Sequence, residues 1–178
     1  MPIIKGVRGF YPVFGKNCFI ADNATIIGDV IAGDYCSFWF GCVVRGDVNS
    51  IRLGNYVNIQ DGVIIHATYQ RTVTIIGDNV SIGHRAVVHG CKIGNNVLIG
   101  IGAIILDNVV IEDNVVVGAG AVLTEGMHIP SGSVVAGVPA RKIKDIDERL
   151  LKDEIMRIAK NYPFYASWYQ QDTKHNET

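Results

Sequence analysis

Aliphatic residues recur at every sixth position through much of the chain. Taken from the clearest stretch, the series is Ile93, Ile99, Ile105, Ile111, Val117, Leu123, Ile129 and Val135. Glycine often follows the aliphatic residue, with Asp or Asn close behind, so turn-forming residues recur too often for helices. A six-residue period is typical of a hexapeptide solenoid, in which three hexads form one triangular coil of about 18 residues. The pattern predicts an all-β protein, a parallel β-helix with a stacked aliphatic core.

The repeat sets the domain organisation. Its extent, from about Pro12 to Ala140, would supply about seven coils, enough for a sizeable core despite 20 glycines. We therefore assign residues 1–140 to the hexapeptide-repeat domain. Residues 141–178 are expected to form a C-terminal helix and tail that belong to the same domain.

A helix signal follows the repeat. Asp145 and Glu148 resemble a capping box, which predicts a helix from Asp145 to about Asn161 with Pro163 ending it. The apolar residues of this segment, at spacings of three and four, are Leu151, Ile155, Ile158 and Tyr162. One stripe of the helix can therefore pack against the solenoid wall or a neighbouring subunit. The polar residues Thr173 to Thr178 are expected to fray.

Charge and composition exclude several classes of function. The chain has 16 Lys and Arg against 17 Asp and Glu, and these charges are scattered, so we expect no nucleic-acid partner. The N-terminal residues lack a signal-peptide pattern and no apolar run is long enough to span a membrane, so a cytoplasmic protein without a membrane partner is expected. The four cysteines, Cys18, Cys36, Cys42 and Cys91, contain no Cys-x-x-Cys pair and are expected to be buried, reduced thiols.

Three histidines fall within the repeat, and the hexad count predicts where they point. His84 is the third residue of the hexad that begins at Ile82, and one residue is missing before the register of Ile93 resumes. If the slip precedes Val87, His89 is also third in its hexad, one corner further round the prism. Each side of the triangle is roughly 15 Å long, whereas zinc ligands lie ~2 Å from one ion. One subunit is therefore not expected to bring His84 and His89 together.

His66 is expected to stack on His89. The segment from Ala67 to Val73 breaks the aliphatic pattern and reads as an extruded loop. Once about six loop residues are removed, His66 and His89 are one coil apart. The third ligand would then come from a neighbour, and a homotrimer with a metal at each interface is the simplest closed arrangement. His128 and His175 lack such partners and are expected to be ordinary surface residues.

The alternative for any single histidine is a surface or satisfied side chain. Three histidines together favour a metal, because neutral imidazole is the commonest zinc ligand and three of them leave a fourth position open. A second polar group lies upstream, in Arg45-Gly46-Asp47 and Asn58-Ile59-Gln60-Asp61, with Gln60 one hexad before His66. These side chains could reach a neighbouring prism, where Arg meets a carboxylate and Gln or Asn orients water. An ordinary salt bridge in a turn is the alternative.

In combination, these segments and the run from Gly83 to Cys91 resemble the γ-class carbonic anhydrase family, over almost the whole chain. The resemblance implies a left-handed β-helix and a homotrimer. It also implies that His66 and His89 of one subunit bind a metal, zinc or else iron or cobalt, with His84 of the neighbour. Arg45 and Asp47 would form an interface network, Gln60 would position the metal-bound oxygen, and Asn58 would line the pocket.

The function implied by the resemblance is the reversible hydration of carbon dioxide to bicarbonate by a metal-bound hydroxide, a lyase reaction. The chain departs from the archetype in its proton path. Val48 replaces a glutamate, and the segment from Ala67 to Thr74 carries no carboxylate. The departure resembles shorter-loop, carbonic-anhydrase-like or ferripyochelin-binding-like members. Two alternatives stay open, namely a metal-binding protein with little hydratase activity and a hexapeptide acyltransferase that uses one histidine as a general base.

Overall fold

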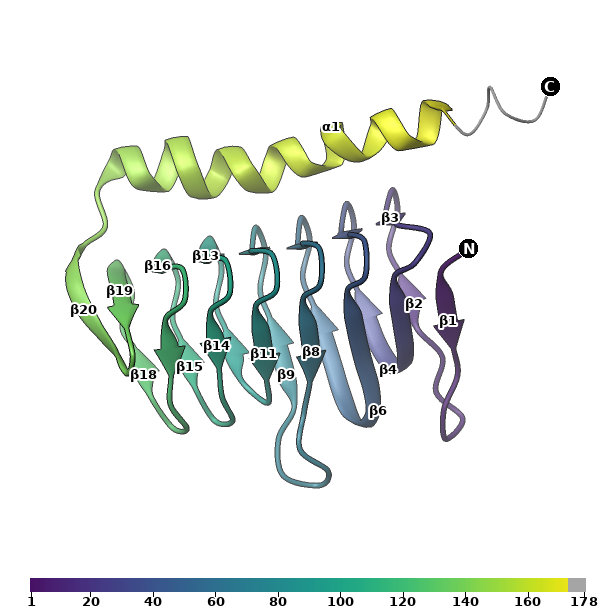
Figure 1. Ribbon diagram of the computed structural model, residues 1–178, viewed down its shortest axis with the longest axis horizontal. Coiled ribbons are helices and arrows are strands. Elements are labelled where there is room, and N and C mark those ends of the chain that lie inside the picture. Colours follow the sequence, from purple (N-terminus) through teal and green to yellow (C-terminus); the bar gives the residue numbers. More distant parts are fainter. Residues whose placement is uncertain (173–178) are drawn as a thin grey trace.

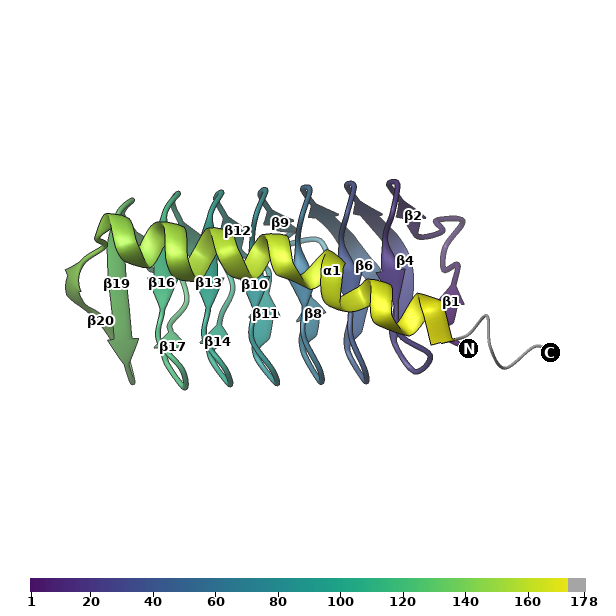
Figure 2. The same cartoon turned by 90° about the horizontal axis from the view of Figure 1, so that it is seen from above.

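The chain folds into a parallel β-solenoid crossed by a C-terminal helix (Figures 1 and 2). The computed structural model describes residues 1–172, so the predicted frayed tail and His175 lie outside the described residues. Seven strands stack along one face, one from each coil. The predicted all-β solenoid of about seven coils with a C-terminal helix is confirmed.

Each coil contributes strands to three faces, which we name the covered, front and rear faces. The covered face, which the helix crosses, consists of β3 (Phe19–Ile20), β5 (Ser37–Phe38), β7 (Asn58–Ile59), β10 (Ser81–Ile82), β13 (Val97–Ile99), β16 (Val115–Val117) and β19 (Ser133–Gly137). The front face consists of β1 (Ile3–Lys5), β8 (Ile64–His66), β11 (Val87–His89), β14 (Ile104–Ile105) and β17 (Val122–Leu123). The rear face consists of β2 (Val13–Phe14), β9 (Thr74–Ile76), β12 (Lys92–Ile93), β15 (Val110–Ile111) and β18 (His128–Ile129).

Three longer strands complete the architecture. β4 (Thr25–Ala32) and β6 (Val43–Leu53) bend from the front face onto the rear face, which joins these two faces into one 12-stranded sheet. β20 (Ala140–Asp145) pairs antiparallel with β19 and closes the C-terminal end of the solenoid. We number the corners in chain order: the first leads from the covered to the front face, the second from the front to the rear face, and the third back to the covered face.

The repeating aliphatics form the core, as the sequence predicts. In the front-face strands, the inward residues are stacked in register and fully buried, namely Ile26, Val44, Ile65, Val88, Ile105 and Leu123. Burying each side chain of this size contributes about 1.5–3 kcal/mol of transfer free energy. Parallel pairing holds the strands of the inner coils against the coils before and after them, so the end of each of these strands has a fixed position. The core therefore determines which residues meet at each corner.

The second corner departs from the regular 18-residue coil three times in succession. Paired Cα positions are 18 residues apart between Thr25 and Val43, but 21 apart between Val30 and Ile51. They are 23 apart between Ile64 and Val87. The first corner insertion therefore adds three residues around Asp47, and the second adds five in the loop that ends β8. The predicted extruded loop is confirmed, with five rather than about six extra residues.

The one-residue slip also lies at the second corner, and its predicted place was wrong. The inward aliphatics run Ile76, Ile82 and Val88, and the next is Ile93, so the residue is missing after Val88 rather than before Val87. His89 consequently follows its inward residue directly, at the end of β11. His84 instead lies two residues beyond Ile82, in the turn. The two histidines therefore do not occupy equivalent positions in their hexads.

The helical segment begins later and ends later than predicted. Asp147, rather than Asp145, caps it, because the Asp147 carboxylate accepts a hydrogen bond from the Leu150 amide at 2.7 Å. A π-helical segment, η1 (Leu150–Met156), leads into α1 (Arg157–Asp172), and Pro163 lies inside α1. Tertiary packing compensates for the hydrogen bond that proline cannot donate. Tyr162, Tyr165 and Ala166 pack against an aromatic cluster on the covered face, with Phe19, Trp39 and Phe40.

The cysteines follow the core pattern. Cys36, Cys42 and Cys91 are buried and Cys18 is half-buried, and all four are free thiols. Burial raises the pKa of Cys42 and of Cys91 to about 12, which keeps both protonated at neutral pH. Among residues 1–172, no helix combines the length and the apolar character needed to cross a membrane.

Candidate metal centre

His66 and His89 are stacked neighbours at the second corner. They are paired in register at the ends of β8 and β11, as the loop excision predicts. The Nδ1 atom of His66 lies 3.2 Å from the Nε2 atom of His89. Two nitrogens that each lie about 2.05 Å from one tetrahedral zinc are roughly 3.3 Å apart. The two rings therefore have the spacing of two ligands on one ion.

In each ring, the nitrogen that faces away from the other histidine, which we call the outer nitrogen, contacts a carboxylate. Asp47 lies 3.1 Å from His66 Nε2, and Asp107 lies 2.6 Å from His89 Nδ1. Arg45 donates a hydrogen bond of 2.5 Å to the other oxygen of Asp47. Because a carboxylate only accepts, each neutral ring places its proton on the outer nitrogen and its lone pair on the inner one. Two lone pairs then face each other, an arrangement that a cation between them would satisfy.

The local electrostatics favour a neutral His66 ring. Partial burial lowers the pKa of His66, and the neighbouring Arg45 adds to this effect, although Asp47 opposes it. For Asp47, burial alone would raise the pKa, but the hydrogen bonds from Arg45 and His66 outweigh it and hold the pKa below its ordinary value. A neutral imidazole oriented by an ionised carboxylate is the usual state of a metal-ligating histidine.

His84 lies in a separate cluster at the first corner. Its Nδ1 atom is 2.9 Å from a carboxylate oxygen of Asp61, and its backbone amide donates to Gln60 Oε1 at 3.2 Å. Gln60 in turn donates to Asn58 Oδ1 at 3.1 Å, and Asn58 donates to Ser81 at 2.5 Å. Gln60 and Asn58 are buried, whereas His84 and Asp61 are each more than two-fifths exposed. Because Asp61 contacts the Nδ1 atom of His84, the Nε2 atom of this ring is the one that could bind a group from another chain.

The sequence-predicted site residues thus form two groups at opposite ends of the front face. Arg45, Asp47, His66 and His89 lie at the second corner, whereas Gln60 and His84 lie at the first, with Asn58 hydrogen-bonded to Gln60 from the covered face. Gln60 precedes His66 by one hexad, yet its side chain bonds at the His84 corner. Within the described residues, no group of three or more His, Cys, Asp or Glu side chains could hold a metal ion.

A cavity lined by aromatic side chains adjoins His84. Its volume is about 260 Å³, and the residues that line it are Trp39, Phe40, Asp61, His84, Tyr162, Tyr165, Trp168 and Tyr169. Burial raises the pKa of Tyr162 to about 12, with the charge of Asp61 adding to the shift. The Tyr162 hydroxyl therefore keeps its proton at neutral pH.

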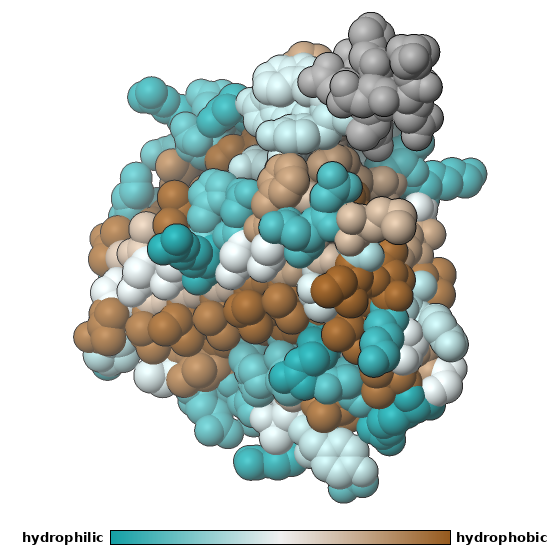
Figure 3. Space-filling model, turned by 45° about the vertical axis from the view of Figure 1, so that its right-hand side comes forward, coloured by the Kyte–Doolittle hydropathy of each residue, from teal (hydrophilic) through white to brown (hydrophobic). Residues whose placement is uncertain are grey.

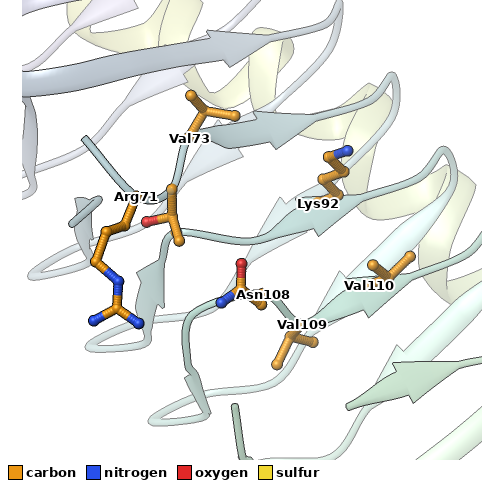
Figure 4. Close-up of a pocket in the computed structure, with 8 residues that line it drawn as sticks. Arg71, Val73, Lys92, Asn108, Val109 and Val110 are labelled. Atoms are coloured by element: carbon orange, nitrogen blue, oxygen red, sulfur yellow. The ribbon is translucent and has the colours of Figure 1, made fainter. Parts of the chain in front are cut away.

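A second cavity, of about 310 Å³, lies on the rear side of the second corner (Figure 4). Arg71 and Lys92 line it together with Thr72, Gly90 and Asn108. Figure 4 shows the charged ends of Arg71 and Lys92 pointing in different directions, so the two cations do not converge on one anion.

Two carboxylates that contact the candidate metal-binding histidines were missed in the sequence prediction. Asp61 closes the Asn-Ile-Gln-Asp run, but the sequence assigns no role to its carboxylate, and Asp107 lies outside the predicted site residues. Asp107 follows His89 by 18 residues, a coil length. The spacing of acidic residues from each histidine, counted in coils, was the signal that could have identified Asp107.

Comparison with known proteins agrees with this architecture. A family model described as bacterial transferase hexapeptide (six repeats) matches residues 73–100 and 90–125. A solved structure of a hexapeptide transferase family protein from Anaplasma phagocytophilum superposes with a TM-score of 0.89 at 37% identity, covering 94% of this chain and 98% of that one. The structure of the BC4754 gene product of Bacillus cereus has a TM-score of 0.91 at 35% identity, with 96% and 98% covered.

Sequence relatives are more specific. A carbonic anhydrase of Geobacillus kaustophilus is 40% identical over 96% of this chain and 95% of its own length. A probable carbonic anhydrase of Methanocaldococcus jannaschii is 52% identical over 79% and 87%. Gamma carbonic anhydrase 1, mitochondrial, of Arabidopsis thaliana is 41% identical over 93% of this chain, which spans 60% of the plant protein. The chain belongs to the γ-class carbonic anhydrase family of hexapeptide-repeat proteins.

Proposed function

We propose that this protein is a homotrimeric, metal-dependent carbonic anhydrase, which hydrates carbon dioxide reversibly to bicarbonate at a site shared by two subunits. The observation that carries the proposal is the pair of facing nitrogens of His66 and His89, 3.2 Å apart and each backed by a carboxylate. His84 of a neighbouring chain would supply the third imidazole. Zinc, iron and cobalt all suit such a donor set.

The front face supports assembly through this surface. Its outward aliphatics stack in register across five coils, as Val43, Ile64, Val87, Ile104 and Val122. Figure 3 shows hydrophobic side chains in a row along the molecule. The corresponding row on the rear face is interrupted by Arg52, Lys92 and His128. An uninterrupted apolar surface is typical of an interface between copies.

The two half-sites lie along the two edges of the front face. Rotation about an axis parallel to the solenoid brings the second corner of one copy against the first corner of the next. His84 and His89 belong to the same coil, so they lie at matching heights on the two copies. Three copies with their front faces turned inward would close three equivalent sites.

His66, His89 and the neighbour's His84 would hold a divalent ion, and that ion, when bound, would supply a hydroxide at neutral pH by lowering the pKa of a water molecule to about 7. The chain's own residues would hold and orient the reactants. Asp47, Asp61 and Asp107 fix the three rings, and Arg45 fixes Asp47. The bonds of Gln60 to His84 and Asn58 keep its amide at the His84 corner, where it could orient the attacking oxygen.

Proton release would depend on solvent. The loop after His66 carries no carboxylate, and its Thr68 and Thr72 hydroxyls bond to Asp107. Tyr162 retains its proton. Small buffer molecules are therefore the proposed proton acceptors.

Metal analysis and stopped-flow hydration of carbon dioxide test the proposal on wild type, H84A and H128A. His128 bonds to Glu112 on the rear face and serves as the matched control. We expect bound metal and hydration in wild type and H128A, and loss of both in H84A. A metal-free protein that transfers acyl groups would overturn the proposal. Metal without hydration, in any buffer and also with ferrous iron, would establish the non-catalytic alternative.

A further inference from the structure

Asp107 is held in place by the loop that follows His66. Thr68 Oγ1 donates to Asp107 Oδ2 at 2.5 Å, and Thr72 Oγ1 lies 3.5 Å from Asp107 Oδ1. The loop closes on itself, because the Thr68 amide donates to Thr72 Oγ1 at 2.9 Å. The two threonines therefore bring the ends of the loop to one carboxylate.

The same carboxylate needs a glycine beside it. Gly90 follows His89 directly and has a φ of +54°, in the left-handed region. A Cβ atom at Gly90 would lie 2.1 Å from Asp107 Oδ1 and 2.3 Å from Thr72 Oγ1, closer than atoms can approach. The corner thus combines a left-handed backbone, an inserted loop and an acid, all arranged around His89.

We propose that Asp107 is the positioning residue for His89, and that the inserted loop serves to hold Asp107 rather than to relay protons. This inference rests on the proposed metal site. Asp107 accepts from His89 Nδ1, which leaves the Nε2 lone pair directed at His66.

The surroundings of Asp107 differ from those of Asp47 in a way that supports this role. Asp47 has the Arg45 guanidinium as a partner, whereas in the described part of the chain no Lys or Arg side chain pairs with Asp107 and its basic neighbour is the imidazole of His89. The side chain of Asp107 is less than one-fifth exposed. Its negative charge is therefore available to the ring of His89 and to a cation bound on the far side of that ring.

Metal affinity in D107A and D107N tests the proposal, with E112Q as the matched control. Glu112 also accepts a hydrogen bond from an imidazole, that of His128, but on the rear face. Zinc and cobalt affinities are measured by chelator competition on the intact protein. We expect D107A to bind about 10- to 100-fold more weakly, D107N to lose less because its amide oxygen can still accept, and E112Q to match wild type.

Histidine tautomers provide a readout that a purely structural role would not change. Nitrogen-15 spectra of the metal-free protein should show His89 protonated at Nδ1 in wild type and E112Q, and a mixture of tautomers in D107A. Replacing Thr68 and Thr72 together by valine should shift the spectrum and the affinity in the same direction, by less. A wild-type tautomer and affinity in both Asp107 variants would overturn the inference while leaving the metal site intact.

The measurements distinguish failure of the proposed metal site from failure of the proposed role of Asp107. If wild type binds no metal, both proposals fail, whereas H84A abolishing metal binding with D107A unaffected contradicts the Asp107 role alone. Thermal unfolding of each metal-free variant identifies any that fail to fold. In that case the isosteric D107N, which preserves the volume of the side chain, decides the outcome.

Discussion

Complementation between two inactive variants tests whether each site takes ligands from two chains. H84A removes the ligand at the first corner, and H89A removes one at the second corner. His84 and His89 are five residues apart and lie at opposite ends of a front-face strand, a span of roughly 16 Å at ~3.3 Å per residue. Two nitrogens on one ion are separated by only about 3.3 Å. Neither variant is therefore expected to hold metal by itself.

Mixed trimers should recover a definite fraction of sites. An intact site requires His66 and His89 from an H84A chain and His84 from the adjacent H89A chain. Every mixed trimer has one such interface in three, and equal mixing makes about three-quarters of the trimers mixed. About one-quarter of wild-type metal and hydration should therefore return.

The assay uses co-expression of the two variants with different affinity tags. Tandem purification isolates mixed trimers, in which about one site in three should hold metal. A pair of H66A and H89A, both at the second corner, is the matched control and should recover nothing. Full metal content in H84A alone, or equal recovery by the control pair, would refute the shared site.

Further measurements test the core, the interface, the thiols and the proton path. Ile105→Ala should lower the free energy of unfolding by about 2–5 kcal/mol, because Ile105 is fully buried. Ile75→Ala, on the exposed side of β9 on the rear face, should lower it much less when both are measured by chemical denaturation. Ile64→Glu should dissociate the trimer in size-exclusion chromatography, whereas Ile75→Glu on the rear face, which is similarly exposed, should not; the reverse would place the interface elsewhere. A hydrogen bond from Cys36 lowers the pKa of Cys18 to about 7. The rate at which the native protein is alkylated should therefore rise through pH 7 and level off above it, and this reaction should be absent in C18S. Hydration should speed up with buffer concentration, and a rate independent of buffer would reveal a proton relay within the protein.

The six-residue period was sufficient to predict the solenoid, because inward aliphatics such as Ile99 and Ile105 report directly on a buried column. It also predicted that His66 stacks on His89. The place of the slip could not be read reliably, because Val87 and Val88 are both aliphatic and either can begin the hexad. Burial decides for Val88, which is fully enclosed while Val87 is not.

The helix and the site show a second limit of prediction from the sequence, which is that local patterns do not reveal contacts between separate coils. Pro163 is a helix breaker in isolation, yet Tyr162 and Ala166 on either side of it pack against the covered face and hold the helix through it. Likewise, the hexad count placed Gln60 one hexad from His66, but its amide bonds across the first corner to His84. Local patterns predict the elements, whereas these contacts arise from how separate coils meet.

The insertion after His66 lengthens the chain without moving what lies on either side of it. β8 and β11 stay paired in register, and β6 pairs with β9 beyond the loop. The coil thus tolerates a change of length at this corner while its ligands keep their positions. A designer could therefore exchange the central residues Tyr69, Gln70 and Arg71 for acidic ones beside the site, provided that Thr68 and Thr72 are kept as its anchors. Acidic residues placed in this loop could supply a proton-transfer group while the strands of the fold stay unchanged.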